Sequence, residues 1–193
     1  MSEIKKIVLF GPESTGKTTL SLELAKHFRT IASPEFARHY VDIKKAHTKA
    51  ENLDEIIEWK DVETIAIGQI HQENLLEQHA NQVLFCDTNL VTTHVYSQLY
   101  FGKSLEWMDS AVEKQAYDFY LLLTVDVPWV ADFQRDSSLN RIELFNTFKS
   151  ELDQREINYK TISGASYKDR LQQVIEIVED FLSSKQPSED GCK

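Results

Sequence analysis

The eight residues from Gly11 to Thr18 read Gly-Pro-Glu-Ser-Thr-Gly-Lys-Thr, the G-x-x-x-x-G-K-T pattern of a phosphate-binding loop. A short apolar run over residues 5–10 precedes the pattern, and Leu20, Leu24 and Phe28 follow it at helical spacing. The sequence therefore predicts a strand, a tight loop and a helix in succession. In that arrangement the backbone N–H groups of the loop form a nest for anions at the positive end of the helix.

The loop predicts binding of ATP and Mg²⁺. Lys17 would reach the β- and γ-phosphates, and the Thr18 hydroxyl would coordinate Mg²⁺. The residues expected to contact the nucleotide are Gly11, Pro12, Glu13, Ser14, Thr15, Gly16, Lys17, Thr18 and Thr19.

Two carboxylates and two arginines are candidates for the chemistry. Asp87 ends the apolar run over residues 83–86, the usual place for a second Mg²⁺-associated carboxylate in phosphate-loop proteins, although a plain turn or cap is the alternative. Glu35 follows a short strand that stops at Ser33-Pro34. Arg135 and Arg141 suit a lid that closes over phosphates, or else the solvated start of a helix.

The order of elements predicts an α/β fold, a phosphate-loop NTPase with a five-stranded parallel sheet and helices on both faces. Strands are expected at 5–10, 30–33, 83–87, 118–125 and 159–162, with Asp42 to Asn52 as a surface connection. Helices are expected at 19–28, 53–80, 88–101, 104–115 with Ser104 as N-cap, after the polar stretch 130–141, and at 167–182. Gly68, inside a helix, suggests a close approach by another group. We expect one kinase domain over residues 1–182 and a disordered tail over 183–193.

Composition narrows the class of protein. The formal net charge of −10 argues against a general nucleic-acid binder, which needs Lys and Arg to neutralise phosphates. There is neither an N-terminal apolar signal segment nor a run of eighteen apolar residues, so we expect a cytoplasmic protein that does not span a membrane. Cys86 and Cys192 are too few for a disulfide framework.

Other phosphate-loop classes fit poorly. The stretches beginning at Asp87 and Thr124 lack the D-x-x-G and N-K-x-D patterns of a GTPase, and there is no room for the extra helical domain of a ring-forming ATPase. What remains is a small-molecule kinase, which works by positioning and charge neutralisation.

The chain resembles the nicotinamide riboside kinase domain of the bifunctional NAD-biosynthesis proteins. The resemblance covers roughly residues 4–182 and rests on motifs that occur in the same order. These are residues 10–18, Glu35-Phe36-Ala37-Arg38, Trp59-Lys60-Asp61, Ala66-Ile67-Gly68-Gln69, Asp87-Thr88-Asn89, Thr92-Thr93, residues 100–103 and Asp126 to Arg135. The family's adenylyltransferase and DNA-binding domains have no counterpart here, so no second activity is expected, and the lid stretch departs from the family's usual acidic pair and glycine.

The resemblance implies phosphorylation of the 5′-hydroxyl of nicotinamide riboside. It implies acceptor contacts from Glu35, Arg38, Trp59, Asp61, Gln69, Asp87, Thr88 and Asn89. Trp59 or Tyr40 could stack on a pyridinium ring, although Trp59 could equally be part of the core. Chemistry favours Asp87, beside the phosphate loop, as the Mg²⁺ partner and Glu35 as the group that accepts the hydroxyl proton, but these roles could be exchanged.

Two alternatives stay open at this point. The chain could be a kinase for another nucleoside or vitamin alcohol, or a non-catalytic ATP-binding regulatory module. The sequence makes no prediction of the oligomeric state.

Overall fold

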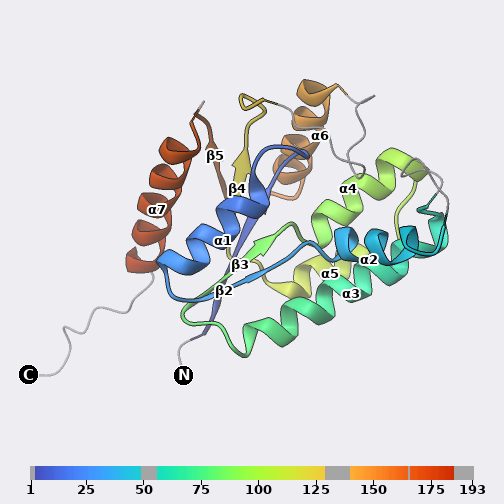
Figure 1. Ribbon diagram of the computed structural model, residues 1–193, viewed down its shortest axis with the longest axis horizontal. Coiled ribbons are helices and arrows are strands. Elements are labelled where there is room, and N and C mark those ends of the chain that lie inside the picture. The colour runs from blue at the N-terminus through green and yellow to red at the C-terminus, as the bar shows by residue number, and fades with distance from the viewer. Residues whose placement is uncertain (1–2, 49–55, 129–139, 165, 185–193) are drawn as a thin grey trace, which may run out of the picture.

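The computed structural model describes residues 3–48, 56–128, 140–164 and 166–184. Within these ranges the strands form one five-stranded parallel sheet, as predicted, and their order across the sheet is β2-β3-β1-β4-β5. The strands are β1 (Lys5–Phe10), β2 (Ile31–Ser33), β3 (Val83–Asp87), β4 (Phe119–Leu123) and β5 (Tyr159–Ile162). Because all strands run the same way, their carboxyl ends meet at one edge of the sheet (Figure 1).

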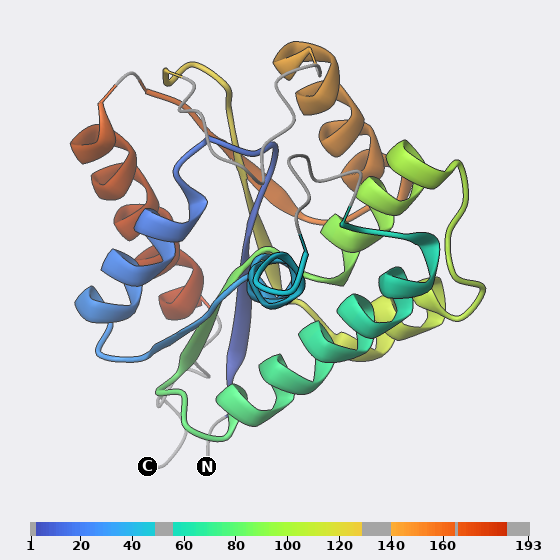
Figure 2. The same ribbon diagram turned by 45° about the vertical axis from the view of Figure 1, so that its right-hand side comes forward.

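Helices cover both faces of the sheet (Figure 2). In chain order they are α1 (Lys17–His27), α2 (Phe36–Lys45), α3 (Trp59–Glu77), α4 (Leu90–Phe101), α5 (Met108–Gln115), α6 (Arg141–Gln154) and α7 (Tyr167–Ser184). Helices α1 and α7 pack on one face, and α3, α4, α5 and α6 pack on the other. No helix in the described part of the chain is long and apolar enough to cross a membrane.

The two cores follow from the alternation of side chains along the central strands. In β1, Ile7 and Leu9 face α1 and α7, whereas Val8 and Phe10 face the α3–α6 layer. All four side chains are fully buried, as expected for a parallel sheet covered on both sides.

Several predicted boundaries are wrong. The connection expected from Asp42 onward begins later, because α2 continues to Lys45, and Lys44 donates a 2.6 Å hydrogen bond to the carboxylate of Asp61 on α3. Ser104 is not an N-cap: α5 starts at Met108, and the Ser104 hydroxyl instead lies 2.9 Å from Nδ1 of His94. The helix expected over 53–80 runs only from Trp59 to Glu77, and the tail expected from residue 183 does not start there, because α7 continues to Ser184. Residues 53–55 and 185–193 lie outside the described residues.

The close approach suggested by Gly68 is confirmed. The ring of Phe36, the first residue of α2, lies against the backbone of α3 at this glycine. A Cβ atom on Gly68 would stand 2.1 Å from Cε1 of Phe36, which is a severe overlap. The absence of a side chain at Gly68 therefore lets the start of α2 press directly on α3.

Substitution of Gly68 by Ala tests this contact. Overpacking of this kind costs ~1–3 kcal/mol, and the higher helix propensity of Ala offsets ~1 kcal/mol of that cost. Gly68→Ala should therefore lower the free energy of unfolding, as measured in urea. The same change in a Phe36→Leu background should cost less, and an equal cost in both backgrounds would show that the ring is not what Gly68 accommodates.

Candidate active site

The phosphate loop connects β1 to α1, and it has backbone conformations that favour glycine at Gly11 and Gly16. Gly16 has φ 87° at the N-cap of α1, and Gly11 has φ 128°. A Cβ on Gly11 would lie 2.8 Å from the carbonyl oxygen of Leu123 at the end of β4, so only glycine fits there. The Thr15 hydroxyl donates a 2.8 Å bond to the Pro12 carbonyl and closes the turn.

Lys17 lies inside this loop. Its Nζ atom donates to the carbonyl oxygens of Gly11 and Pro12 at 2.9 and 2.6 Å. Burial lowers the pKa of Lys17, and the negative charges of Glu35, Asp87 and Glu13 oppose that shift. The ammonium is therefore placed where three carboxylates and the loop converge.

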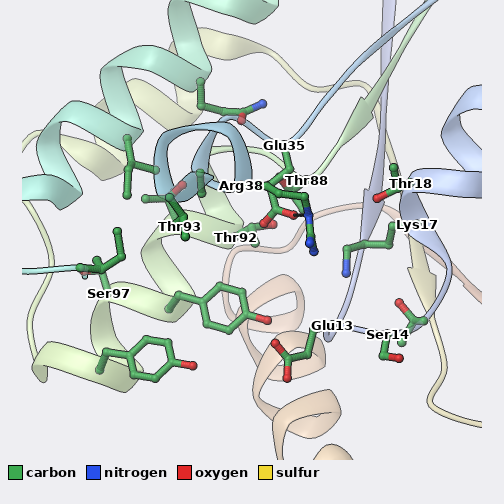
Figure 3. A pocket seen from close by; sticks show the side chains of 18 of the residues that line it. Glu13, Ser14, Lys17, Thr18, Glu35, Arg38, Thr88, Thr92, Thr93 and Ser97 are labelled. Atoms are coloured by element: carbon green, nitrogen blue, oxygen red, sulfur yellow. Dashed lines mark ion pairs between the residues drawn. The ribbon is translucent and has the colours of Figure 1, made fainter. Parts of the chain in front are cut away.

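A cavity of about 480 Å³ adjoins the loop. Figure 3 shows Lys17 and Arg38 directed into the space between Glu13 and Glu35. The residues that line the cavity are Glu13, Ser14, Thr15, Gly16, Lys17, Thr18, Thr19, Glu35, Ala37, Arg38, Val41, Ile57, Val62, Ile65, Gln69, Thr88, Thr92, Thr93, Tyr96, Ser97, Tyr100 and Phe101. One cavity thus joins the phosphate loop to α2, α3 and α4.

The two predicted carboxylates lie close enough to affect each other. Burial raises the pKa of Glu35, and the charge of Asp87 raises it further, while Lys17 and Arg38 lower it. The Nε atom of Arg38 is 3.6 Å from the Glu35 carboxylate. Burial also raises the pKa of Asp87, against the effect of Lys17. Only Glu35 of this pair lines the cavity.

Asp87 and Thr18 have the chemistry of a Mg²⁺ site. Burial raises the pKa of the Asp87 carboxylate, and the Thr18 hydroxyl lies near enough to lower it. Among the residues that the structure describes, the buried Oδ1 atom of Asp87 has no hydrogen-bond partner. A buried carboxylate oxygen without a partner, beside a hydroxyl at the phosphate loop, fits a hard cation that also takes phosphate oxygens. In the described ranges no three Asp, Glu, His or Cys side chains lie close enough together to hold a metal ion by themselves, so phosphates or water would have to complete the coordination.

The sharp turn after β3 determines where the side chains of Thr88 and Asn89 lie. Thr88 lines the cavity with φ 70°, a left-handed conformation that a β-branched residue rarely adopts. Asn89, predicted to contact the acceptor, instead caps α4 by accepting from the Thr92 N–H, and it donates to the Tyr120 hydroxyl at 2.7 Å. Asn89 is buried away from the cavity lining.

Three more residues that were predicted to contact the acceptor lie outside the cavity lining, namely Asp61, Tyr40 and Trp59. Asp61 forms a capping box with Glu58 at the start of α3, accepts from the Tyr40 hydroxyl at 2.7 Å and pairs with Lys44. Tyr40 is occupied by this network, which raises its pKa to about 12 through the hydrogen bond to Asp61. These two residues hold α2 against α3.

The ring of Trp59 is also engaged elsewhere. It packs edge-on against Phe101, and the ammonium of Lys103 lies 4.1 Å from the ring centroid. Because Lys103 already provides a cation over this ring, stacking of Trp59 on a pyridinium has no support in the structure. By contrast, Glu35, Arg38, Gln69 and Thr88 all line the cavity, as expected for acceptor contacts.

Of the two lid arginines, Arg141 can be placed. At the start of α6 its guanidinium donates to the carbonyl oxygens of Val127 and Ser14, at 2.9 and 3.4 Å. It therefore touches the phosphate loop. Arg135, with the rest of the predicted lid, lies outside the described residues.

No site role was predicted for the α4 wall of the cavity, although Thr92 and Tyr100 lie in motifs noted in the sequence. Thr92, Tyr96 and Tyr100 fall on one stripe of this helix, and the two tyrosine rings stack with centroids 5.9 Å apart. Their regular spacing could have indicated a common face. Burial raises the pKa of Tyr96 well above its ordinary value, so it stays neutral.

Arg170 was missed as well. This buried side chain of α7 donates to the carbonyl oxygens of Thr15, Gly164 and Thr124, at 2.9, 2.8 and 3.0 Å, and pairs with Asp126. One guanidinium thus links the phosphate loop to the ends of β4 and β5. The signal was that Arg170 continues the stripe of Val174 and Val178, where an apolar residue would be expected.

Comparison with known proteins agrees with this arrangement. A family model described as an AAA domain matches residues 6–170, which is most of the chain. The chain belongs to this AAA domain family. The match includes the phosphate loop, both carboxylates and Arg170.

Among relatives of this AAA domain protein is the trifunctional NAD biosynthesis/regulator protein NadR of Escherichia coli strain K12, 28% identical over 184 residues. The alignment covers 94% of this chain but only 44% of that protein. Among solved structures, NadR in complex with NAD and AMP-PNP has a TM-score of 0.77 at 22% identity, covering 98% of this chain and 52% of that chain. NadR in complex with NR has a TM-score of 0.76 at 22% identity, covering 96% and 52%. These structures show the same fold.

The role of Arg170 in this AAA domain protein can be tested with Arg170→Lys. A lysine has one charged nitrogen and lacks the planar fork that reaches three carbonyl groups at once. The phosphate loop should lose its support, and the Kd for an ATP analogue should rise by about tenfold or more, equivalent to ~1.4 kcal/mol.

Arg155→Lys is the matched control. Arg155 also forms two ion pairs, with Glu151 and Asp109, but lies away from the loop. Both variants should lower the melting temperature, while calorimetric titration should detect weaker nucleotide binding only for Arg170→Lys. Equal affinity in the two variants would make Arg170 a general structural residue.

Proposed function

We propose that this protein is a kinase that transfers the γ-phosphoryl group of ATP to the 5′-hydroxyl of nicotinamide riboside, yielding nicotinamide mononucleotide and ADP. The observation that carries the proposal is the single cavity in which the phosphate loop, Glu35 and the α4 wall face one another. The relationship to NadR, whose solved structures hold NR and an ATP analogue, supports the choice of acceptor.

In this proposal the phosphates of ATP bind to the N–H groups of residues 11–19, and Lys17 turns from the loop carbonyls to the phosphoryl group. Arg141, already in contact with Ser14, and Arg135 stabilise the charge that develops on transfer. Thr18 and Asp87 would hold Mg²⁺, which would supply positive charge against the phosphates.

Glu35 accepts the proton in the proposed reaction. The acceptor hydroxyl attacks the γ-phosphorus, its proton passes to the Glu35 carboxylate, and the bond to the leaving ADP oxygen breaks. Burial raises the pKa of Glu35 toward the range where proton uptake is efficient, and the ion pair with Arg38 keeps the carboxylate oriented. Asp87 lies behind the loop and does not line the cavity, which supports its assignment to the metal.

The rest of the cavity suits a cationic nucleoside. Glu13 and Glu35 line the cavity and supply negative charge, which favours a pyridinium ring over neutral or anionic bases. Tyr96 and Tyr100, in place of Trp59 and Tyr40, provide the aromatic surface, and Arg38, Gln69 and Thr88 offer hydrogen bonds. We further propose that the protein acts on small molecules in the cytoplasm. The net charge of −10 supports the part of this proposal that excludes nucleic acid as a partner.

The acceptor is tested by measuring kcat/KM for nicotinamide riboside, nicotinic acid riboside, uridine, deoxyadenosine and thiamine with Mg-ATP. Nicotinamide riboside should exceed the neutral nucleosides by about tenfold or more, or ~1.4 kcal/mol in transition-state stabilisation. Preference for uridine, deoxyadenosine or thiamine would assign the kinase to another nucleoside or vitamin alcohol. ATP binding without phosphorylation of any acceptor would instead indicate a regulatory module.

The base is tested by Glu35→Gln. The amide keeps the shape of the carboxylate but cannot take the proton, so kcat should fall by ~10²–10⁴ while the KM for the riboside changes little. Glu35→Asp, which keeps a carboxylate on a shorter side chain, should retain more activity than Glu35→Gln. A wild-type kcat in Glu35→Gln would transfer the role of base to another group, with Asp87 as the first candidate.

A further inference from the structure

Glu73, on α3, is fully buried although it can carry a charge. Each of its carboxylate oxygens accepts one hydrogen bond. Oε1 accepts from Nε2 of Gln69 at 2.7 Å, and Oε2 accepts from the Tyr117 hydroxyl at 2.7 Å. Glu73 does not line the cavity, but Gln69 does. Gln69 therefore connects the buried carboxylate to the wall of the site.

The bond to Glu73 determines which way the Gln69 amide faces. A carboxylate can only accept from this amide, or donate to its oxygen if protonated, so the observed pairing places the NH₂ group toward Glu73. The amide oxygen is then turned the other way, where it accepts the backbone N–H of Phe36 at 2.9 Å. In the opposite orientation the amide would present N–H groups to the N–H of Phe36, so that bond would be lost, and the ionised Glu73 carboxylate would lose its bond as well.

The N–H of Phe36 is important because Phe36 is the first residue of α2. The first N–H groups of a helix have no partner within the helix, and a side chain at the N-cap usually satisfies one of them. The N-cap of α2 is Glu35, and its side chain makes no capping hydrogen bond. Gln69, from another helix, supplies the missing acceptor. The Glu35 carboxylate is thereby left to face the cavity and Arg38.

We propose that Glu73 is a positioning residue for the acceptor side of the site: by orienting Gln69 it fixes the start of α2, and with it Glu35 and Arg38. The kinetic part of this inference rests on the proposed kinase function, but the structural part does not. Glu73 itself touches neither nucleotide nor acceptor in this scheme.

At position 73 the proposed role requires a hydrogen-bond acceptor for Gln69 and does not require a negative charge. Burial raises the pKa of Glu73 to about 7, so the neutral acid is readily reached at physiological pH. In Glu73→Gln the side-chain oxygen can still accept from Gln69, and the new NH₂ group can donate to the Tyr117 hydroxyl oxygen. Glu73→Leu has similar volume but offers no acceptor, so the orientation of Gln69 is no longer fixed.

The experiment compares Glu73→Leu, Glu73→Gln and Tyr117→Phe with the wild type. Tyr117→Phe is the matched control, because it removes the hydrogen bond to the other oxygen of the same carboxylate and leaves the Gln69 bond in place. Two properties are measured. The first is hydrogen exchange of the Phe36 amide by NMR, without any substrate, and the second is the KM for nicotinamide riboside and for ATP.

In Glu73→Leu the Phe36 amide should exchange at least tenfold faster, and the KM for the riboside should rise at least fivefold while the KM for ATP stays within twofold. Glu73→Gln and Tyr117→Phe should resemble the wild type in both properties, whatever their melting temperatures. If Glu73→Leu does not fold, Gln69→Leu provides the same exchange measurement, since it removes the acceptor of the Phe36 N–H directly.

Several outcomes would overturn the proposal. These are unchanged Phe36 exchange in the leucine variant, an equal effect of Tyr117→Phe, or a parallel rise in both KM values, which would indicate general destabilisation. Faster Phe36 exchange in an enzyme that phosphorylates a different acceptor would instead retain Glu73 as a positioning residue and refute only nicotinamide riboside as substrate.

Discussion

The pairing of β1 with both β3 and β4 is the constraint on which the site depends. This strand lies at the centre of the sheet, so the loop that follows it opens between the ends of its two neighbours. Asp87 ends β3 on one side, and the Leu123 carbonyl of β4 presses on Gly11 from the other. A parallel sheet brings these ends together whatever helices intervene, and the helices then supply the remaining walls.

Burial sets the electrostatics at this edge. Removal from water disfavours the charged forms of Lys17, Glu35 and Asp87 alike, and each is partly compensated by charges of opposite sign nearby. The balance is local, since the ammonium, the guanidinium of Arg38 and the carboxylates all meet around one cavity. A bound phosphate group and a divalent cation would add charges of both signs to this set, which suits a site for phosphoryl transfer.

Much of the fold and of the nucleotide side could be predicted from the sequence. The glycine loop, its flanking strand and helix, and the carboxylate after β3 are local signals, because chain neighbours determine them. The rest of the cavity lining was harder to predict, since its members come from α2, α3 and α4. Asp61 and Asn89 have the right chemistry in the right motifs, yet one caps α3 and the other caps α4. Sequence motifs alone did not separate residues that cap a helix from residues that face the cavity.

The missed residues share a recognisable feature. Arg170 and Glu73 occupy helix positions that should be apolar by periodicity, and each is buried with a hydrogen-bond partner at every side-chain nitrogen or oxygen. A polar residue on a buried stripe costs stability unless it is bonded, so its presence indicates a defined partner elsewhere in the fold. The identity of that partner depends on long-range packing, which the linear pattern does not contain.

The attachment of α2 to α3 has a mechanical consequence. The first residue of α2 is held by Gln69 and by the contact with Gly68, and its last turn is held by the bond from Lys44 to Asp61. A helix fastened at both ends cannot swing about either one, so α2 and α3 must move as one rigid piece. If α2 and α3 form a rigid wall of the cavity, that wall favours ligands whose shape already fits it, because it cannot adapt to other shapes. Any closing motion around a bound molecule would then have to come from the opposite rim of the cavity.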